Sequence, residues 1–132
     1  MMGVPIVYID HSSIRPGKLS EVRQAIDELV PFIEEREPQL LHYGFYVDEA
    51  ASRLTVIAVH PDPASVELHL DVGGPAFRGF APLIEMEGIE VYGPTSDRML
   101  EQLNEKAAVL GDRGTVVVCG LHSGFARGAA NA

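Results

Sequence analysis

The chain of 132 residues predicts an α+β fold, and two patterns of hydrophobic residues support that class. Short runs rich in β-branched and aromatic residues indicate strands, and apolar residues that recur every three or four positions indicate amphipathic helices. Along the chain these segments follow the order β-α-β-β-α-β, and one more helix and strand come after them. Hydrophobic residues form 46% of the chain, enough for a core, and the length fits one domain.

The first half of the chain contains three predicted strands and one long helix. The helix begins at Leu19 and carries apolar residues at helical spacing up to Ile33, and Pro31 should kink it or end its regular part. The third strand is apolar on both faces, as expected of a central strand, and a turn joins it to the second strand as a hairpin. The three strands are expected at residues 4–11, 39–47 and 53–60.

The second half of the chain begins with a helix for which Asp62 is a good N-cap and Pro63 a good first residue. We interpret Gly73 and Gly74 as a turn that ends this helix. A short helical piece, a strand, a third helix and a last strand then follow, at residues 76–83, 86–92, 96–109 and 115–121.

This order of elements describes a ferredoxin-like sandwich, with the helices on one face of the sheet. The other face would be bare, and the apolar residues on both faces of the strands require cover. We therefore predict a homodimer formed through the open sheet face. One domain would occupy residues 1–132, with residues 95–122 as a C-terminal extension and residues 123–132 as a flexible tail.

The composition excludes several classes of partner. The net charge of −9 and the absence of a run of Lys or Arg argue against nucleic acid and anionic membrane surfaces. Cys119 is the one cysteine, so we expect no disulfide framework and interpret it as a buried, inert thiol. The N-terminal residues lack the features of a signal peptide, and no apolar run is long enough to span a membrane. These features predict a cytoplasmic protein.

Two histidines mark the corner where the third strand meets the second helix. His60 ends the strand and would face the same compartment as Tyr8 if the first and third strands pair in the usual register. The alternative for His60 is that it only satisfies the loop before Asp62. His69, on the helix, could remove a proton from a phenol or quinol, because imidazole titrates near neutral pH. The alternative for His69 is a core-facing histidine bonded to a backbone carbonyl.

Four further side chains could bind a small aromatic substrate. Tyr8 and Tyr46 could orient it through their hydroxyls, although such tyrosines are often half-buried residues at a dimer face. Phe77 would line the cavity, and Arg78 beside it could attract a phenolate, unless it is a solvated surface arginine. The acidic run at residues 34–37 is interpreted as a solvated helix end.

No metal or cofactor is expected. The five histidines never stand at the i, i+4 spacing of a helical pair, although His60, His69 and Glu67 could converge in space. The sequence shows no Ser-His-Asp order, nucleophile elbow or carboxylate dyad. This favours chemistry in which the protein supplies only a base, desolvation and orientation.

Three stretches, taken in order, point to a known family. They are Arg15-Pro16-Gly17-Lys18 before an acidic amphipathic helix, Glu37-Pro38-Gln39 leading into Leu41, Tyr43 and Tyr46, and Asp62 followed by Ala64 and His69-Leu70. Together they resemble the antibiotic biosynthesis monooxygenase-like family of dimeric α/β-barrel proteins. The resemblance covers about residues 4–93, so the final helix and strand lie outside it.

The resemblance implies a ferredoxin-like fold and a pocket that includes His69, whereas His60 has no counterpart in the family pattern. Because the chain contains no Trp, it departs from the Trp-dependent haem-degrading members. We therefore predict a cofactor-independent monooxygenase that acts on a small phenolic or quinol-like aromatic, with His69 as the base. The alternatives are a non-catalytic ligand-binding or stress-related dimeric barrel, and a haem-binding or haem-degrading protein.

Overall fold

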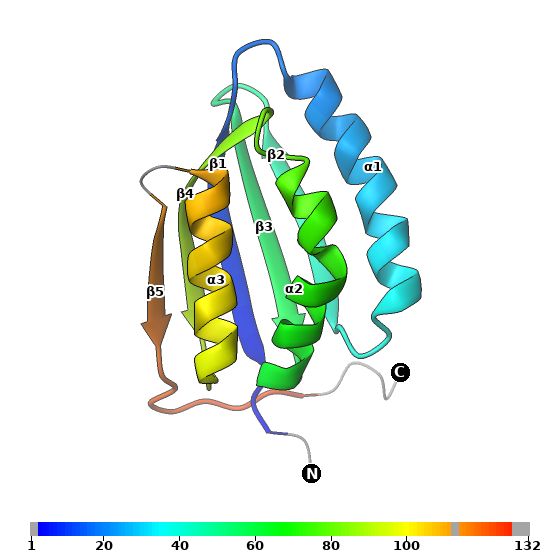
Figure 1. The fold of residues 1–132 in the computed structure, drawn as a ribbon. Helices are drawn as coiled ribbons and strands as arrows, with labels where there is room; N and C mark the ends of the chain where they lie inside the picture. Colours follow the sequence, from blue (N-terminus) through cyan, green and yellow to red (C-terminus); the bar gives the residue numbers. More distant parts are fainter. Residues whose placement is uncertain (1–2, 112–113, 128–132) are drawn as a thin grey trace.

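The computed structural model describes residues 3–111 and 114–127, which form three helices and five strands. In chain order the elements are β1 (Ile6–Ile14), α1 (Leu19–Arg36), β2 (His42–Asp48), β3 (Arg53–His60), α2 (Pro63–Arg78), β4 (Ile84–Tyr92), α3 (Asp97–Leu110) and β5 (Thr115–Cys119). The three helices lie together on one face of the sheet (Figure 1). The predicted α+β architecture, with an added C-terminal helix and strand, is confirmed.

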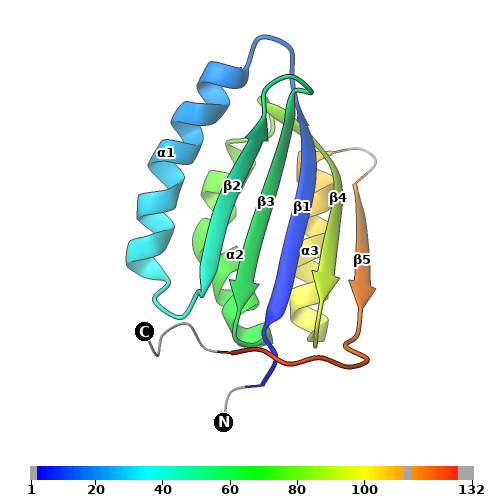
Figure 2. The ribbon, with the colours of Figure 1, turned by 180° about the vertical axis from the view of Figure 1, so that it is seen from behind.

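The sheet has the strand order β2-β3-β1-β4-β5, and it is open rather than closed into a barrel (Figure 2). The central strand β1 runs antiparallel to both neighbours, so that Tyr8 lies opposite Ala58 of β3 and Val91 of β4. The added strand β5 pairs in parallel with β4 and extends the sheet at that edge. The pairing of β1 with β3 places His60 on the same sheet face as Tyr8, as predicted.

Two of the helices, α2 and α3, begin at residues whose side chains cap them. The side chain of Asp62 accepts a hydrogen bond from the backbone N–H of Ser65 at the start of α2. Ser96 does the same for Met99 at the start of α3. The backbone N–H of Gly111 ends α3 by donating to the carbonyl of Ala107.

Helix α2 does not end at Gly73 and Gly74, so the predicted turn and the separate helical piece at residues 76–83 are wrong. The helix continues to Arg78. A Cβ on Gly73 would lie 2.4 Å from Cζ of Phe77, so this glycine leaves the space that the phenyl ring fills. The packing of that ring outweighs the low helix propensity of glycine, which costs about 1 kcal/mol per residue.

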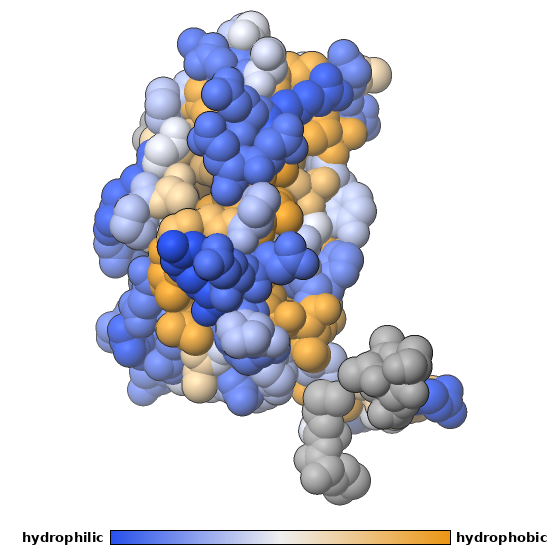
Figure 3. Space-filling model, turned by 90° about the vertical axis from the view of Figure 1, so that its right-hand side faces the viewer, coloured by the Kyte–Doolittle hydropathy of each residue, from blue (hydrophilic) through white to orange (hydrophobic). Residues whose placement is uncertain are grey.

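Several strand boundaries also differ from the prediction by a few residues: β2 begins at His42, β4 begins at Ile84 and β5 ends at Cys119. The strand β1 extends to Ile14 because both neighbouring strands pair with it beyond residue 11; Ser12, for example, lies opposite Leu54 and Met86. Pro31 lies inside α1, so it does not end the helix, which continues to Arg36. In the view from the side of α1, hydrophilic residues cover much of the surface and hydrophobic residues show beside them (Figure 3).

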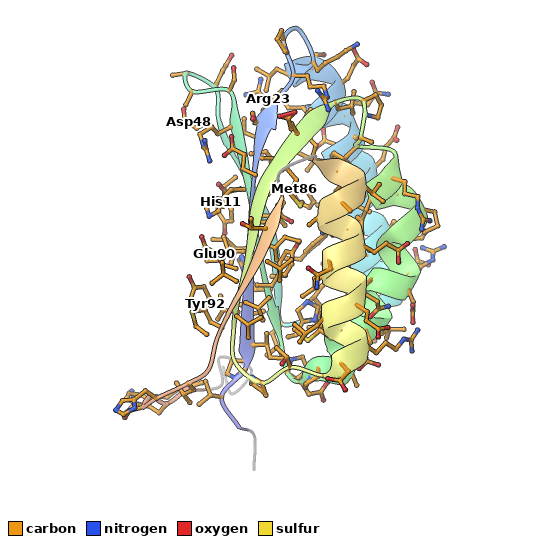
Figure 4. The ribbon with its side chains drawn as sticks, turned by 60° about the vertical axis from the view of Figure 1, so that its left-hand side comes forward. His11, Arg23, Asp48, Met86, Glu90 and Tyr92 are labelled. Atoms are coloured by element: carbon orange, nitrogen blue, oxygen red, sulfur yellow. The ribbon has the colours of Figure 1, made fainter. Side chains whose placement is uncertain are left out.

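The side chains of β1 alternate between the two faces of the sheet. Those of Tyr8 and Asp10 are buried beneath the helices, whereas those of its neighbours on the other face are half-buried. Figure 4 shows His11, Glu90 and Tyr92 on the side away from the helices. The same face also carries the half-buried Ile9 and Ile57, so it is partly apolar, and no helix from the described residues lies on it (Figure 2).

The C-terminal part of the chain departs from one expectation. Cys119 is exposed, so the prediction of a buried thiol is wrong, because β5 is the last strand of the sheet and most of its side chains are exposed. Residues 120–127 form neither helix nor strand and pass below the ends of the central strands (Figure 2). The rest of the predicted flexible tail lies outside the described residues. None of the helices in the described part of the chain has the length and hydropathy that a membrane span requires.

Candidate functional site

The two predicted histidines meet in the interior, between the sheet and the helices. His60, at the end of β3, is 1% exposed, and His69, in α2, is 3% exposed. Their ring centroids lie 5.3 Å apart. The two imidazole rings therefore lie in one compartment of the interior.

The closest polar partner of His69 is Glu37, which follows α1 directly. The carboxylate oxygens of Glu37 lie 2.8 and 3.0 Å from Nδ1 of His69, and Glu37 is 2% exposed. The interpretation of residues 34–37 as a solvated helix end is therefore wrong for this residue. A signal was present in the sequence: Glu37 stands four positions after the buried Ile33 and continues the inward stripe of α1.

Burial and the contact with Glu37 together determine the protonation state and the tautomer of His69. Burial lowers the pKa of its imidazole, and the hydrogen bond and charge of Glu37 oppose that effect without cancelling it. The ring is therefore neutral at neutral pH. Because a carboxylate only accepts hydrogen bonds, Nδ1 carries the proton and donates it to Glu37, which leaves a lone pair on Nε2. Within the described residues Nε2 forms no hydrogen bond, so His69 can act there as a base.

His60 is held in a different way. Its Nδ1 lies 2.7 Å from the hydroxyl oxygen of Ser65, in the first turn of α2. Burial lowers the pKa of His60 to about 3, and the neighbouring His69 and Lys106 lower it in the same direction. His60 is thus a neutral polar group that packs against His69 and is a poor proton acceptor.

Two aromatic rings complete the surroundings of His69. The ring of Tyr43, from β2, contacts His69 edge-on at 5.0 Å between centroids, and the ring of Phe77 lies at 5.2 Å. Burial raises the pKa of Tyr43, and the charges of Asp10 and Glu37 raise it further, so its hydroxyl stays protonated. The imidazole therefore lies in a low-dielectric, largely aromatic environment.

A second polar cluster lies in the same interior, and of its three members only Tyr8 was predicted from the sequence as a site residue. We call Tyr8, Asp10 and Lys106 the Lys106 cluster. The hydroxyl of Tyr8 donates to Oδ2 of Asp10 at 2.5 Å, and Nζ of Lys106 donates to the oxygen of Tyr8 at 2.8 Å. Lys106 stands seven positions after the buried Met99, two helical turns along the inward stripe of α3, which was the available signal.

The interior contains a small cavity beside these clusters. Its volume is about 30 Å³, and Asp10, Tyr43, Phe77 and Lys106 are among its lining residues. A groove of about 320 Å³ runs along the outer side, between α2 and α3. Phe77, Lys106 and Leu110 line both spaces, so these side chains stand between the groove and the interior.

The other predicted site residues lie elsewhere. Tyr46 is 48% exposed on the bare face of the sheet, where its hydroxyl lies 3.0 Å from Nε2 of His42. Arg78 pairs with Glu105 on the surface, at the edge of the outer groove. Among the described residues, no group of three His, Cys, Asp or Glu side chains could hold a metal ion.

Comparison with known proteins identifies the fold. No family model and no curated protein sequence matches this chain. Among solved structures, MupZ from Pseudomonas fluorescens matches with a TM-score of 0.70 and 18% identity, over 94% of this chain and 95% of MupZ. A "putative antibiotic biosynthesis monooxygenase" from Caulobacter crescentus matches with a TM-score of 0.60 and 17% identity, over 68% of this chain and 89% of its own.

A third solved structure is SnoaB, a cofactor-independent oxygenase from Streptomyces nogalater. It matches with a TM-score of 0.58 and 14% identity, over 70% of this chain and 95% of SnoaB. The match with MupZ spans nearly the whole chain, whereas the other two leave part of it uncovered. At these identities the likeness concerns the fold. The chain thus has the ferredoxin-like fold of the antibiotic biosynthesis monooxygenase-like proteins, as the sequence resemblance implied.

Proposed function

We propose that this protein is a cofactor-independent monooxygenase that acts on a small phenolic or quinol-like aromatic, with His69 as the base. The observation that carries the proposal is the buried contact between Nδ1 of His69 and the carboxylate of Glu37. The carboxylate fixes the tautomer and stabilises the imidazolium that forms when Nε2 takes a proton. The fold of SnoaB, a cofactor-independent oxygenase, is consistent with this chemistry.

The proposed reaction balances without a cofactor, because a phenol and O₂ give a quinone and water. His69 removes the phenolic proton, and the electron-rich phenolate transfers electrons to O₂. A C–O bond forms at a ring carbon that still carries hydrogen, and the peroxide takes up a proton. Loss of the ring hydrogen as a proton and cleavage of the O–O bond, with departure of hydroxide, leave a carbonyl group and water. The protein supplies the base, a dry environment and orientation.

The direct test is oxygen uptake with a panel of hydroquinones and naphthols. Wild-type protein should consume O₂, and His69→Ala should reduce the rate by about 10²-fold or more, the usual contribution of a general base. His122→Ala, which changes an exposed histidine, is the matched control and should keep the wild-type rate. Equal uptake by folded His69→Ala and wild-type protein would overturn the assignment of the base.

The second candidate is a binding module without turnover. It is favoured by the weak basicity of the two histidines: burial lowers the pKa of His69, and His60 is bonded to Ser65 with its pKa lowered to about 3. This candidate predicts that the phenols bind to the protein but that no O₂ is consumed. A haem-handling role has less support, because both interior histidines are buried and the interior cavity of about 30 Å³ is far too small for a porphyrin.

We also propose that the bare sheet face pairs with a second copy of the chain. Supporting features are the half-buried Ile9 and Ile57 on that face and the exposed rings of Tyr46 and Tyr92. Burying this apolar surface would stabilise a symmetric dimer. The cytoplasmic location expected from the sequence stays a prediction.

A further inference from the structure

The Lys106 cluster is a buried charge arrangement that the proposed proton transfer to His69 does not use. Asp10 is 3% exposed and the side chain of Lys106 is 10% exposed. The helix α3 carries Lys106 across the interior to Tyr8 on the central strand β1. Even a buried ion pair can lose more by desolvation than it gains from its mutual attraction, so an ion pair beside a cavity is a candidate for a role in binding.

The cluster has unused capacity to donate. An ammonium group has three N–H donors, and within the described residues Lys106 contacts two acceptor atoms, the oxygen of Tyr8 at 2.8 Å and Oδ2 of Asp10 at 3.4 Å. Asp10, in contrast, already accepts from both Tyr8 and Lys106. The third donor of Lys106 is therefore available to an acceptor atom in the cavity that Lys106 lines.

A second observation points to a polar group in the same place. Ser12, the next residue after Asp10 on the helix-facing side of β1, is 0% exposed, and its hydroxyl has no hydrogen-bond partner among the described residues. The cross-strand neighbours of Ser12 are Leu54 and Met86, and both line the interior cavity. Unpartnered buried hydroxyls are uncommon, and a ligand oxygen next to this strand could satisfy one.

The base and the Lys106 cluster flank the same aromatic ring. The ring centroids of Phe77 and His69 lie 5.2 Å apart. Nζ of Lys106 lies 4.1 Å from the ring centroid of Phe77 and forms a cation–π contact with it. Phe77 also separates the interior cavity from the outer groove. A ligand that enters from the groove and displaces this ring would contact His69 at one end and Lys106 at the other.

The net charge of the Lys106 cluster restricts the kind of ligand group that can bind to Lys106. The pair of Lys106 and Asp10 is neutral overall, so an anionic ligand would leave one uncompensated negative charge beside Asp10 in a low-dielectric interior. A carbonyl oxygen accepts a hydrogen bond from the ammonium without adding charge. The ammonium would also stabilise this carbonyl oxygen if negative charge developed on the oxygen during the reaction.

We propose that Lys106 is a specificity-determining residue that binds a carbonyl oxygen, so that the ligand is an aromatic phenol that carries a ketone at its other end. The proposal rests on the proposed function in taking the interior around His69 as the ligand site. It assigns a role to the C-terminal helix α3, which brings Lys106 to that site. Burial lowers the pKa of Lys106 and Asp10 opposes that effect, as expected of an ammonium that depends on buried partners.

The test uses two probes that differ in one group. One is a hydroxytetralone with its phenol and ketone on opposite rings, and the other is the tetrahydronaphthol that has a methylene in place of the ketone. Binding is measured by calorimetry under nitrogen, so turnover does not enter the result. Wild-type protein should bind the ketone about tenfold more tightly, the factor that corresponds to one hydrogen bond from a charged donor.

Lys106→Met should abolish the preference for the ketone and leave the affinity for the tetrahydronaphthol unchanged. Because this change leaves Asp10 without its cation, the double variant with Lys106→Met and Asp10→Asn provides a second measurement in which the Lys106 cluster carries no charge. The control is Lys18→Met, which changes the other lysine of the chain and should keep the preference, because Lys18 pairs with Glu21 on the surface.

The outcomes test the role of Lys106 and the proposed function separately. If wild-type protein binds both probes equally, or if the preference survives in both Lys106 variants, the role of Lys106 is overturned. In that case tetrahydronaphthol binding that is lost in His69→Ala would still support the proposed site. If neither probe binds to the wild-type protein, the interior is not a phenol site, and the proposed function fails together with this inference.

Discussion

The carboxylate of Glu37 lies 2.8 Å from Nδ1 of His69 and joins the end of α1 to the middle of α2 inside the protein. This contact gives the imidazole a fixed tautomer and a fixed orientation in an apolar setting. It also makes each group dependent on the other, since removal of one leaves a buried polar partner unmatched, at a cost of about 1–3 kcal/mol. The contact therefore carries both the chemistry and part of the stability of the site.

The first prediction concerns the pH dependence of oxygen uptake. Glu37 raises the pKa of His69, so Glu37→Gln should lower that pKa and move the acid limb of the rate profile to lower pH. The plateau rate should fall about tenfold or more, because the imidazolium loses its counter-charge. Glu35→Gln, at an exposed carboxylate, is the control and should change neither quantity. An acid limb that stays in place in Glu37→Gln would contradict the assignment of His69.

The second prediction concerns acid stability. The pKa of His60 is about 3 in the folded protein and 6.5 in its ordinary state, so the unfolded chain takes up the proton first as the pH falls. The contribution of His60 to folding is thus complete above the ordinary pKa and is lost progressively toward the folded pKa. The slope is about 1.4 kcal/mol per pH unit at its steepest.

His60→Gln removes this titration and can keep a hydrogen bond to Ser65. Its free energy of unfolding, measured by urea denaturation, should therefore change less steeply with pH between those two pKa values than that of the wild-type protein. His122→Gln, at an exposed histidine, should keep the wild-type slope. Parallel pH dependences in wild-type and His60→Gln protein would show that His60 does not titrate as proposed.

The third prediction compares two neighbouring glycines of α2. Gly73→Ala should destabilise the protein by about 1–3 kcal/mol, because the new Cβ would lie 2.4 Å from the ring of Phe77. Gly74→Ala meets no atom within 4 Å and should stabilise the helix by about 0.5–1 kcal/mol. Thermal and urea unfolding measure both effects. The same sign for the two changes would contradict the packing of Phe77 on Gly73.

The fourth prediction concerns the bare sheet face. A dimer should form at micromolar protein concentration, and Ile57→Lys should convert it to a monomer, because the lysine would place a charge in the buried interface. Leu68→Lys, at an exposed leucine of α2, is the control and should remain a dimer. Sedimentation velocity distinguishes the two states. A monomeric wild-type protein would exclude the proposed pairing.

The positions of side chains could be predicted from the sequence where one element decides their orientation. The alternation along β1 and β3 places Tyr8 and His60 on the helix-facing side, and their strand pairing then puts them in one compartment. The prediction failed at Gly73, where local propensity favours a turn but the ring of Phe77 needs a residue without Cβ inside the helix.

The partners of the site residues could not be inferred from the order of the elements. Glu37 closes an acidic run, and only the packing of α1 against α2 turns its carboxylate inward to His69. Lys106 is 96 positions from Asp10 along the chain, and only the docking of α3 on the sheet brings the two together.

The sequence by itself determined the element types, the α+β class and the inward positions of His60 and His69, because hydrophobic periodicity and capping residues act over a few positions along the chain. Only the tertiary structure decided which charges are buried and what they contact. The reason is physical: a carboxylate or an ammonium enters the interior only where a partner from another element compensates its desolvation, and that partner is chosen by packing over long distances in sequence.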